Sequence, residues 1–472
     1  MNRWPKTCGS SSTWIDALTD TLHVAVIDIG KTNAKLALVD LDALKEIEVR
    51  KRPNLVLPGP PYPHYDTDGL WQFILGGLTE MHRSHGIDAI TVTTHGASAA
   101  LLDGDGGLAA PVLDYEHGGP DTLAADYDAV RPEFAETGSP RLPMGLNLGA
   151  QLFWQFETFP DIRRRTRAIV TYPQYWTSCL TGKAVNEVTS LGCHTDLWCP
   201  SENRFSSLVQ KAGWADLMAP VAKAADCLGP VLQDVANATG LSRDTPVYCG
   251  IHDSNASFYT HMLSRGKPFA VVSTGTWVIS MAIGGDVVEL DPARDTLINV
   301  SAFGDQVPSA RFMGGREFDR VMEGFSHTYV ERDVATVMDQ GIMLLPSVET
   351  GSGPFRGQRH RWSVEETSLT DGQRFVAVSF YLALMTATGL EMIGANGPAL
   401  VEGPIADNPV FLDMLVAATG RPVSAVAGTG TSIGAALLTG KGGLKERRED
   451  ELRTGEAGMD SYARKWRASV SG

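Results

Sequence analysis

A short turn near the start of the chain carries residue types that hold phosphate. The apolar segment His23–Ile29 contains Asp28 and is followed by the turn residues Gly30, Lys31, Thr32 and Asn33. Because glycine has no side chain, the backbone amides of such a turn can approach an anion closely. A carboxylate at the end of the strand suits Mg²⁺, which keeps several waters. We therefore expect an anion at this turn and Mg²⁺ at Asp28.

A second glycine turn, at Gly275 and Thr276, again lies between two apolar strands. It offers amides and hydroxyls without a positive charge, and opposite the first turn it would complete a cradle for a polyphosphate. The residues Gly-Lys-Thr of the first turn also resemble the end of a P-loop. That motif requires a glycine five residues before Gly30, where this chain has Ala25, so a P-loop is excluded.

Asp253 follows the apolar strand 246–249 directly, at a strand end where α/β folds place their ligands. A carboxylate there can accept the proton of an attacking hydroxyl in phosphoryl transfer. Aspartate is also a favoured helix N-cap, and the two roles are compatible. The same argument makes His95, with Gly96 after it, and Glu116, with His117 after it, candidate contacts of a polar substrate. A lone histidine is, however, more often structural.

The elements that position these residues follow from hydrophobic periodicity. A helix is predicted over 68–85 and a strand over 87–92, after the opening hairpin. The second half repeats the opening as strand, glycine turn and strand over 268–284, followed by a helix at 372–393 and a strand at 399–402. Alternating strands and helices predict α/β layers. We expect two domains, 20–245 and 246–472, with ligands between them and a solvated segment after Gly440.

Composition limits the partners. The chain has 472 residues, 43% of them hydrophobic, and a net charge of −15 without a long basic stripe. Nucleic acid and membrane surfaces are therefore disfavoured as partners, and an anion must be held by backbone amides, a helix terminus or a metal. No stretch suggests a membrane-spanning helix or a signal peptide, so we expect a cytoplasmic protein. The six cysteines contain no C-x-x-C pair, and we interpret Cys193 and Cys199 as buried thiols rather than metal ligands.

Four segments together resemble the FGGY family of carbohydrate kinases. VAVIDIGKTNAKLALVD is similar to the first phosphate motif of that family, STGTWVIS to the second, and PVYCGIHDSNASF to the segment of the catalytic aspartate. VEGPIADNPVFLDMLVAATGRPVSAVAGTGTSIGAALL resembles the adenosine-binding segment. The segments occur in the family's order between Leu22 and Gly440.

The resemblance implies an α/β protein of two actin-like, ribonuclease-H-like domains with an active-site cleft between them, acting on a sugar with ATP and Mg²⁺. Asp253 would be the general base and Asp28 the Mg²⁺ ligand. Phosphates would contact Gly30, Lys31, Thr32, Asn33, Gly275 and Thr276. The adenosine would lie by Gly403, Asn408, Gly428 and Thr429, and the sugar by His95, Gly96, Glu116, His252 and Asp253. A homodimer is compatible with the resemblance.

Two departures from the family pattern bear on the substrate. Lys31 stands where many members have threonine, so it either contacts phosphate or is solvated. The segment 113–117 lacks the arginine of the usual W-x-D-x-R pattern. The turn D-I-G-K-T-N and the segment G-I-H-D are closer to the rhamnulokinase and fuculokinase branch, which favours L-rhamnulose, L-fuculose or a related ketose. The alternative is an actin-like nucleotide-dependent switch or sugar sensor that has no phosphoryl acceptor.

Overall fold

The computed structural model describes the chain except for residues 1–22, 427–429, 441–452, 454–457 and 471–472. Its first sheet is built around β1 (His23–Ile29), which pairs antiparallel with β2 (Asn33–Asp40) and parallel with β6 (Ala89–Thr94). The other strands of the sheet are β3 (Lys45–Pro53), β14 (Cys227–Pro230), β15 (Pro246–Tyr248) and β16 (Ile251–His252). The hairpin and the third strand expected from the sequence are confirmed.

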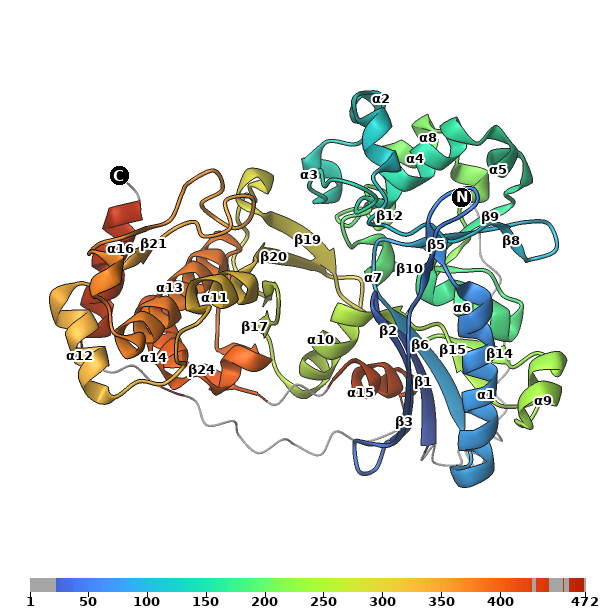
Figure 1. Ribbon diagram of the computed structural model, residues 1–472. Coiled ribbons are helices and arrows are strands. Elements are labelled where there is room, and N and C mark those ends of the chain that lie inside the picture. The colour runs from blue at the N-terminus through green and yellow to red at the C-terminus, as the bar shows by residue number, and fades with distance from the viewer. Residues whose placement is uncertain (1–22, 427–429, 441–452, 454–457, 471–472) are drawn as a thin grey trace, which may run out of the picture.

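The second sheet repeats this arrangement. Its central strand β17 (Phe269–Thr274) pairs antiparallel with β18 (Val278–Ile283) and parallel with β23 (Ala399–Glu402). The remaining strands are β19 (Thr296–Val300), β20 (Gln306–Phe312) and β24 (Val423–Ala425). Figure 1 shows the two sheets side by side, each in its own half of the molecule. The repeat predicted from the two glycine turns is therefore present in the structure.

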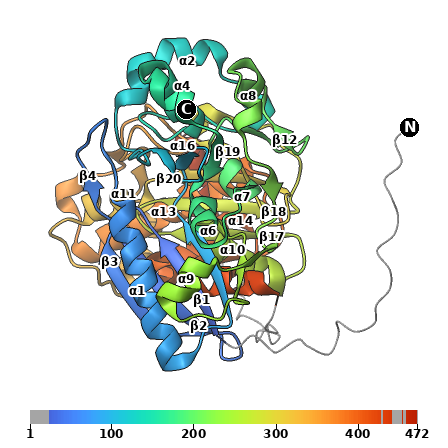
Figure 2. The same ribbon diagram turned by 90° about the vertical axis from the view of Figure 1, so that its right-hand side faces the viewer.

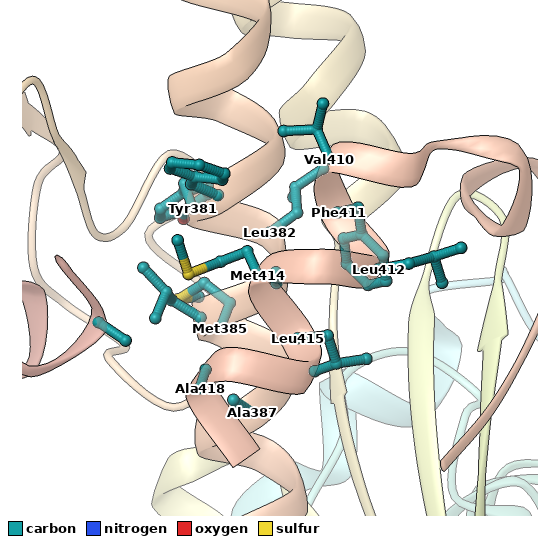
Figure 3. Packing of buried hydrophobic residues seen from close by; sticks show 14 of the residues in the cluster. Tyr381, Leu382, Met385, Ala387, Val410, Phe411, Leu412, Met414, Leu415 and Ala418 are labelled. Atoms are coloured by element: carbon teal, nitrogen blue, oxygen red, sulfur yellow. The ribbon is translucent and has the colours of Figure 1, made fainter. Parts of the chain in front are cut away.

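The core of the second half is formed by two apolar helices, α13 (Asp371–Met392) and α14 (Pro409–Thr419). Tyr381, Leu382 and Met385 of α13 pack against Phe411 and Met414 of α14 (Figure 3). Within the described residues, α13 alone is long and apolar enough to cross a membrane, contrary to the sequence expectation. Its apolar window is 83% buried inside the fold, so its composition is explained by packing on all sides.

Helix α10 (Asp253–Ser264) lies between the two sheets. Ala256 and Tyr259 on one side of the helix pack with the first sheet, and Phe258 and Met262 on the other pack with the second. Helix α15 (Gly430–Ala436), from the end of the chain, lies against α10 and the first sheet (Figure 1). Asp253 is thus held at the start of a helix that both halves of the molecule contact.

Alternate residues of β1 point to opposite faces of the first sheet. Val24 and Val26 face the side of α10 and α15, whereas Ala25, Ile27 and Ile29 face the other side, which α1 (Thr67–His85) covers. Figure 2 shows α1 and α9 (Gln233–Thr239) together at the front of this half. Helix α6 (Tyr172–Thr181) packs on β6. A lobe above the sheet contains β7 (Ala99–Leu102), β8 (Leu108–Ala110), β9 (Ala168–Thr171), α2 (Ala124–Val130), α3 (Phe134–Thr137), α4 (Leu148–Thr158), α5 (Pro160–Arg165), α7 (Val188–Leu191) and α8 (Ser207–Lys211).

Two details refine the sequence expectations. The division into domains at Thr245 stays a prediction, but β15 and β16 pair with β6, so the first sheet extends beyond that point to His252. The segment after Gly440 was expected to be solvated. Of its described part, α16 (Met459–Val470) buries one face, with Trp466 fully enclosed and donating its indole N–H to the carbonyl of Leu344. A helix with one apolar face is not recognisable from charge density alone.

Candidate active site between the two sheets

Asp253 begins α10, and His252 before it is the N-cap residue, so Asp253 is not itself the cap. The Asp253 side chain is 28% exposed, and its Oδ1 accepts the backbone N–H of Ser254 at 2.6 Å. Burial raises the pKa of this carboxyl above its usual range. A carboxylate with a raised pKa is a better proton acceptor, as a general base requires.

The segment before Asp253 is fixed by a buried carboxyl. The backbone N–H of His252 donates to Thr189 Oγ1 at 3.0 Å, and this hydroxyl in turn donates to Glu187. Burial raises the pKa of Glu187 to about 7. This chain of hydrogen bonds ties the start of α10 to the first half of the molecule and holds the backbone beside Asp253 in place.

A small cavity of about 160 Å³ lies beside Asp253, between the two sheets. Gly96 and His252, both predicted as sugar contacts, line it, as does Ser254, the residue after Asp253. The second sheet contributes Ile279, Met281, Leu297, Asn299 and Arg311, and the first half adds Tyr115, Leu146, Cys193 and His194. The cavity therefore has walls from both halves of the molecule.

His95 is buried next to this cavity and does not line it. Its Nδ1 lies 2.8 Å from the carbonyl oxygen of Gly96, and the rings of Tyr65, Tyr115 and Tyr172 surround it at 5.1 to 5.4 Å. Burial lowers the pKa of His95 to about 4, so the ring is neutral at neutral pH. Its Nε2 has no hydrogen-bond partner among the described residues.

The first glycine turn is closed by a hydrogen bond from the amide of Gly30 to the carbonyl of Asn33, 2.9 Å long. The side-chain amide of Asn54 donates to the carbonyl of Gly30, also at 2.9 Å. Lys31 leaves this turn and forms an ion pair with Asp114 and a second one, 3.3 Å long, with Glu116. The ammonium group of Lys31 is therefore paired with two carboxylates of the protein and is not simply solvated.

The ammonium of Lys31 also lies 4.7 Å from the centre of the Tyr115 ring. Glu116 is 58% exposed and does not line the small cavity. Segment 113–117, which lacks the arginine of the family pattern, is thus joined by ion pairs to Lys31 of the first turn.

Asp28 is 8% exposed and contacts Lys35 Nζ at 3.2 Å and the hydroxyl of Thr431, both through Oδ2. Burial raises the pKa of Asp28, and the negative charge of Asp253 adds to the effect. No group of three or more His, Cys, Asp or Glu side chains that could hold a metal occurs in the described part of the chain. One or two carboxylates with water and phosphate oxygens suit Mg²⁺, so Asp28 fits that ion.

A larger cavity, of about 650 Å³, lies in the second half. Gly275, Thr276 and Asn408, which are predicted contacts of the phosphates and the adenosine, line it together with apolar residues including Phe318 and Phe375. Gly403 adjoins it and packs so closely on Thr274 that a Cβ atom would lie 2.0 Å from the Thr274 carbonyl oxygen. Gly428 and Thr429 lie outside the described residues. Residues 30–33 belong to the first half and do not line this cavity.

Several lining residues were not found from the sequence. Phe318, Asp319, His327 and Tyr329 of the large cavity lie on or after α11 (Gly314–Met322). The pair Gly314 and Gly315, which begins this helix, was an available signal, because the second glycine lies against the carbonyl of Gly275. Arg311 and Asn299 of the small cavity lie on β20 and β19, and their common position depends on the non-local register of these strands.

Comparisons with known proteins show the family to which the chain belongs. Residues 23–259 match the N-terminal domain of the FGGY family of carbohydrate kinases, and residues 266–448 match the C-terminal domain. The chain therefore belongs to the FGGY family, whose members are phosphotransferases. The family and the fold class of two actin-like domains, both predicted from the sequence, are confirmed.

Individual relatives differ in how far the similarity extends. A carbohydrate kinase from Novosphingobium aromaticivorans is 37% identical, with a TM-score of 0.87 over 94% of this chain and 100% of its own. The xylulose kinase from Rhodospirillum rubrum is 20% identical with a TM-score of 0.76, covering 95% of this chain and 98% of its own, and shares the fold. L-fuculokinase from Salmonella typhi is 24% identical over 56% of this chain, and the match spans 57% of that protein.

Proposed function

We propose that the protein is an ATP-dependent sugar kinase that transfers the γ-phosphoryl group of ATP to a hydroxyl of a ketose. The observation that carries the proposal is the position of Asp253, which begins a helix between the sheets, next to a small cavity that its neighbours His252 and Ser254 line. The large cavity in the same half as the second glycine turn has the size and the apolar walls that suit a nucleoside.

In this reaction the carboxylate of Asp253 accepts the proton of the sugar hydroxyl as its oxygen forms a bond to the γ-phosphorus. The bond from that phosphorus to the bridging oxygen breaks, and ADP leaves with the electron pair. The amides of the turn at Gly275 and Thr276 would stabilise charge on the phosphates. Mg²⁺, held by Asp28 through water, would neutralise further charge when bound.

L-rhamnulose, L-fuculose or a related ketose is the proposed acceptor. The support is the motifs G-I-H-D and D-I-G-K-T-N and the similarity to L-fuculokinase, which covers about half of each chain. The competing function is a nucleotide-dependent switch or sugar sensor that hydrolyses ATP and has no phosphoryl acceptor. The small cavity beside Asp253 favours the kinase over a plain switch, because a switch needs no site for a second substrate there. A sugar sensor would also bind sugar, and the formation of a sugar phosphate separates it from the kinase.

The test is a panel of ketoses and polyols with ATP and Mg²⁺, in which ADP release and phosphorylated sugar are both measured. We expect at least one ketose to stimulate ADP release, with one sugar phosphate formed for each ADP. ADP release that no sugar changes would support the switch and overturn the kinase.

A further inference from the structure

The wall that the second sheet presents to the small cavity carries two polar residues among apolar ones. Ile279 pairs with Arg311, so both point to the same face, and Leu297 and Asn299 of β19 are two residues apart. All four line the cavity. Their position follows from sheet register and is therefore not an accident of flexible loops.

Arg311 is held there without its hydrogen-bonding capacity being filled. Its guanidinium lies 5.1 Å from the centre of the Trp277 ring, and its Nη2 is 3.5 Å from Asp295, which is a long contact for an ion pair. The side chain is 16% exposed, and its Nε has no partner among the described residues. A buried donor without a partner is costly, which indicates that a partner binds there.

In Asn299 it is a hydrogen-bond acceptor that lacks a partner. Its amide nitrogen donates to Ser309 Oγ at 3.0 Å, whereas its Oδ1 is buried without a partner among the described residues. One unfilled acceptor and one unfilled donor on the same wall of one cavity suit a ligand that both donates and accepts hydrogen bonds. Hydroxyl groups of a sugar have that property.

The opposite wall is uncharged. Burial lowers the pKa of His194 to about 4, with the charge of Arg311 adding to the effect, and burial raises the pKa of the Cys193 thiol to about 12. The Nδ1 of His194 lies 2.7 Å from the Leu146 carbonyl, so in the neutral ring Nδ1 carries the proton and Nε2 can accept. This wall therefore adds hydrogen-bonding groups and no second cation.

We propose that Arg311 and Asn299 bind the end of a neutral sugar that is remote from the hydroxyl deprotonated by Asp253, and so determine which sugar is accepted. This inference rests on the proposed function. Arg311 donates to a sugar oxygen, and Asn299 Oδ1 accepts from a sugar hydroxyl. A sugar acid fits poorly, because the carboxylate of Asp295, 3.5 Å from Arg311, partly neutralises the one cationic side chain among the lining residues.

The test uses Arg311→Met, with Arg356→Met as the matched control. Arg356 also lies near Asp295, at 3.9 Å, but it does not line the cavity. We expect the KM for the ketose to rise about tenfold to a hundredfold in Arg311→Met, because the variant loses one hydrogen bond from a charged donor to the sugar. The kcat and the KM for ATP should stay within about threefold, and Arg356→Met should change neither KM.

Binding of L-rhamnulose, L-fuculose, xylulose and gluconate without ATP is measured in parallel by calorimetry, so that the inference does not depend on turnover. If ketoses bind but none of them is phosphorylated, the proposed function is overturned, while their weaker binding to Arg311→Met would still support the inference. Unchanged ketose affinity in folded Arg311→Met, a preference for gluconate, or no binding of any of the four would overturn the inference. If Arg311→Met does not fold, Asn299→Leu is measured in the same way, with the same criteria.

Discussion

The Nε2 atom of His252 lies 3.2 Å from Oδ1 of Asp253. Burial lowers the pKa of His252 to about 4, so at neutral pH this neighbour of the proposed base is an uncharged ring. The same Oδ1 also accepts the backbone N–H of Ser254. Both contacts fix the direction of the carboxyl group without adding a positive charge that would lower its pKa.

Asp253→Asn removes the proton acceptor and keeps the shape of the side chain. We expect kcat to fall about 10²- to 10⁴-fold, the usual contribution of a general base, with ATP affinity and thermal stability close to wild type. ADP release and binding of a fluorescent ATP analogue measure the two effects. The control is Asp234→Asn, an exposed aspartate in the first turn of α9, which should leave kcat unchanged. Near wild-type turnover by Asp253→Asn would contradict its role.

The pH dependence of kcat/KM should have an acid limb that belongs to Asp253. The base must be ionised, so the rate falls as the pH drops through its pKa, and burial raises that pKa above the usual range of an aspartate. His95, His252 and His194 have pKa values lowered to about 4 and stay neutral above that range. We expect no limb near pH 6.5. A limb there that disappears in His252→Asn would show that a histidine ionises during turnover.

Lys31→Thr tests whether the lysine serves the phosphates or the fold. Because its ammonium is paired with Asp114 and Glu116, we expect the KM for ATP to change by less than about twofold. The free energy of unfolding should fall by roughly 1–3 kcal/mol, since the largely buried Asp114 loses its cation. Denaturant unfolding measures this loss, and it should shrink in the background of Asp114→Asn. A tenfold rise in the KM for ATP with unchanged stability would instead assign Lys31 to the phosphates.

Gly315→Ala should weaken nucleotide binding. A Cβ atom at Gly315 would lie 2.0 Å from the carbonyl oxygen of Gly275, so the helix start and the glycine turn would have to separate. We expect the KM for ATP to rise at least about fivefold and stability to fall by about 1–3 kcal/mol. Gly351→Ala is the control, because a Cβ there meets nothing within 4 Å. An unchanged KM for ATP would show that the nucleotide does not depend on this approach.

The secondary structure could be predicted from the sequence where a local run of apolar residues is enough to define a strand. The apolar strands on both sides of Gly30 and Gly275 gave the centre of each sheet, because a strand buried on both faces is continuously apolar. β3 was not predicted, since its sequence KEIEVRKRP is largely polar and it is the edge strand of the first sheet. Such a strand is defined by its pairing with β2, which is a non-local contact.

In the candidate site, too, residues marked by a local motif could be predicted, and residues placed by non-local contacts could not. Gly96, His252 and Asn408 were placed near a cavity by motif and strand end, and the structure brings each to one. Glu116 and Lys31 were candidate ligand contacts, yet they pair with each other, a contact between segments far apart in the chain. Arg311 and Asn299 became visible only when the register of β18, β19 and β20 placed them on one wall.

Helix α15 has a consequence for how the protein is made. Ala435, Leu437 and Leu438, in and directly after this helix, share a buried cluster with Val24 and Val26 of the opening strand. During synthesis the first sheet leaves the ribosome long before the residues that cover this face. The nascent first half must therefore keep an apolar surface exposed until α15 has been synthesised, so truncation before α15 should yield aggregating material rather than an isolated domain.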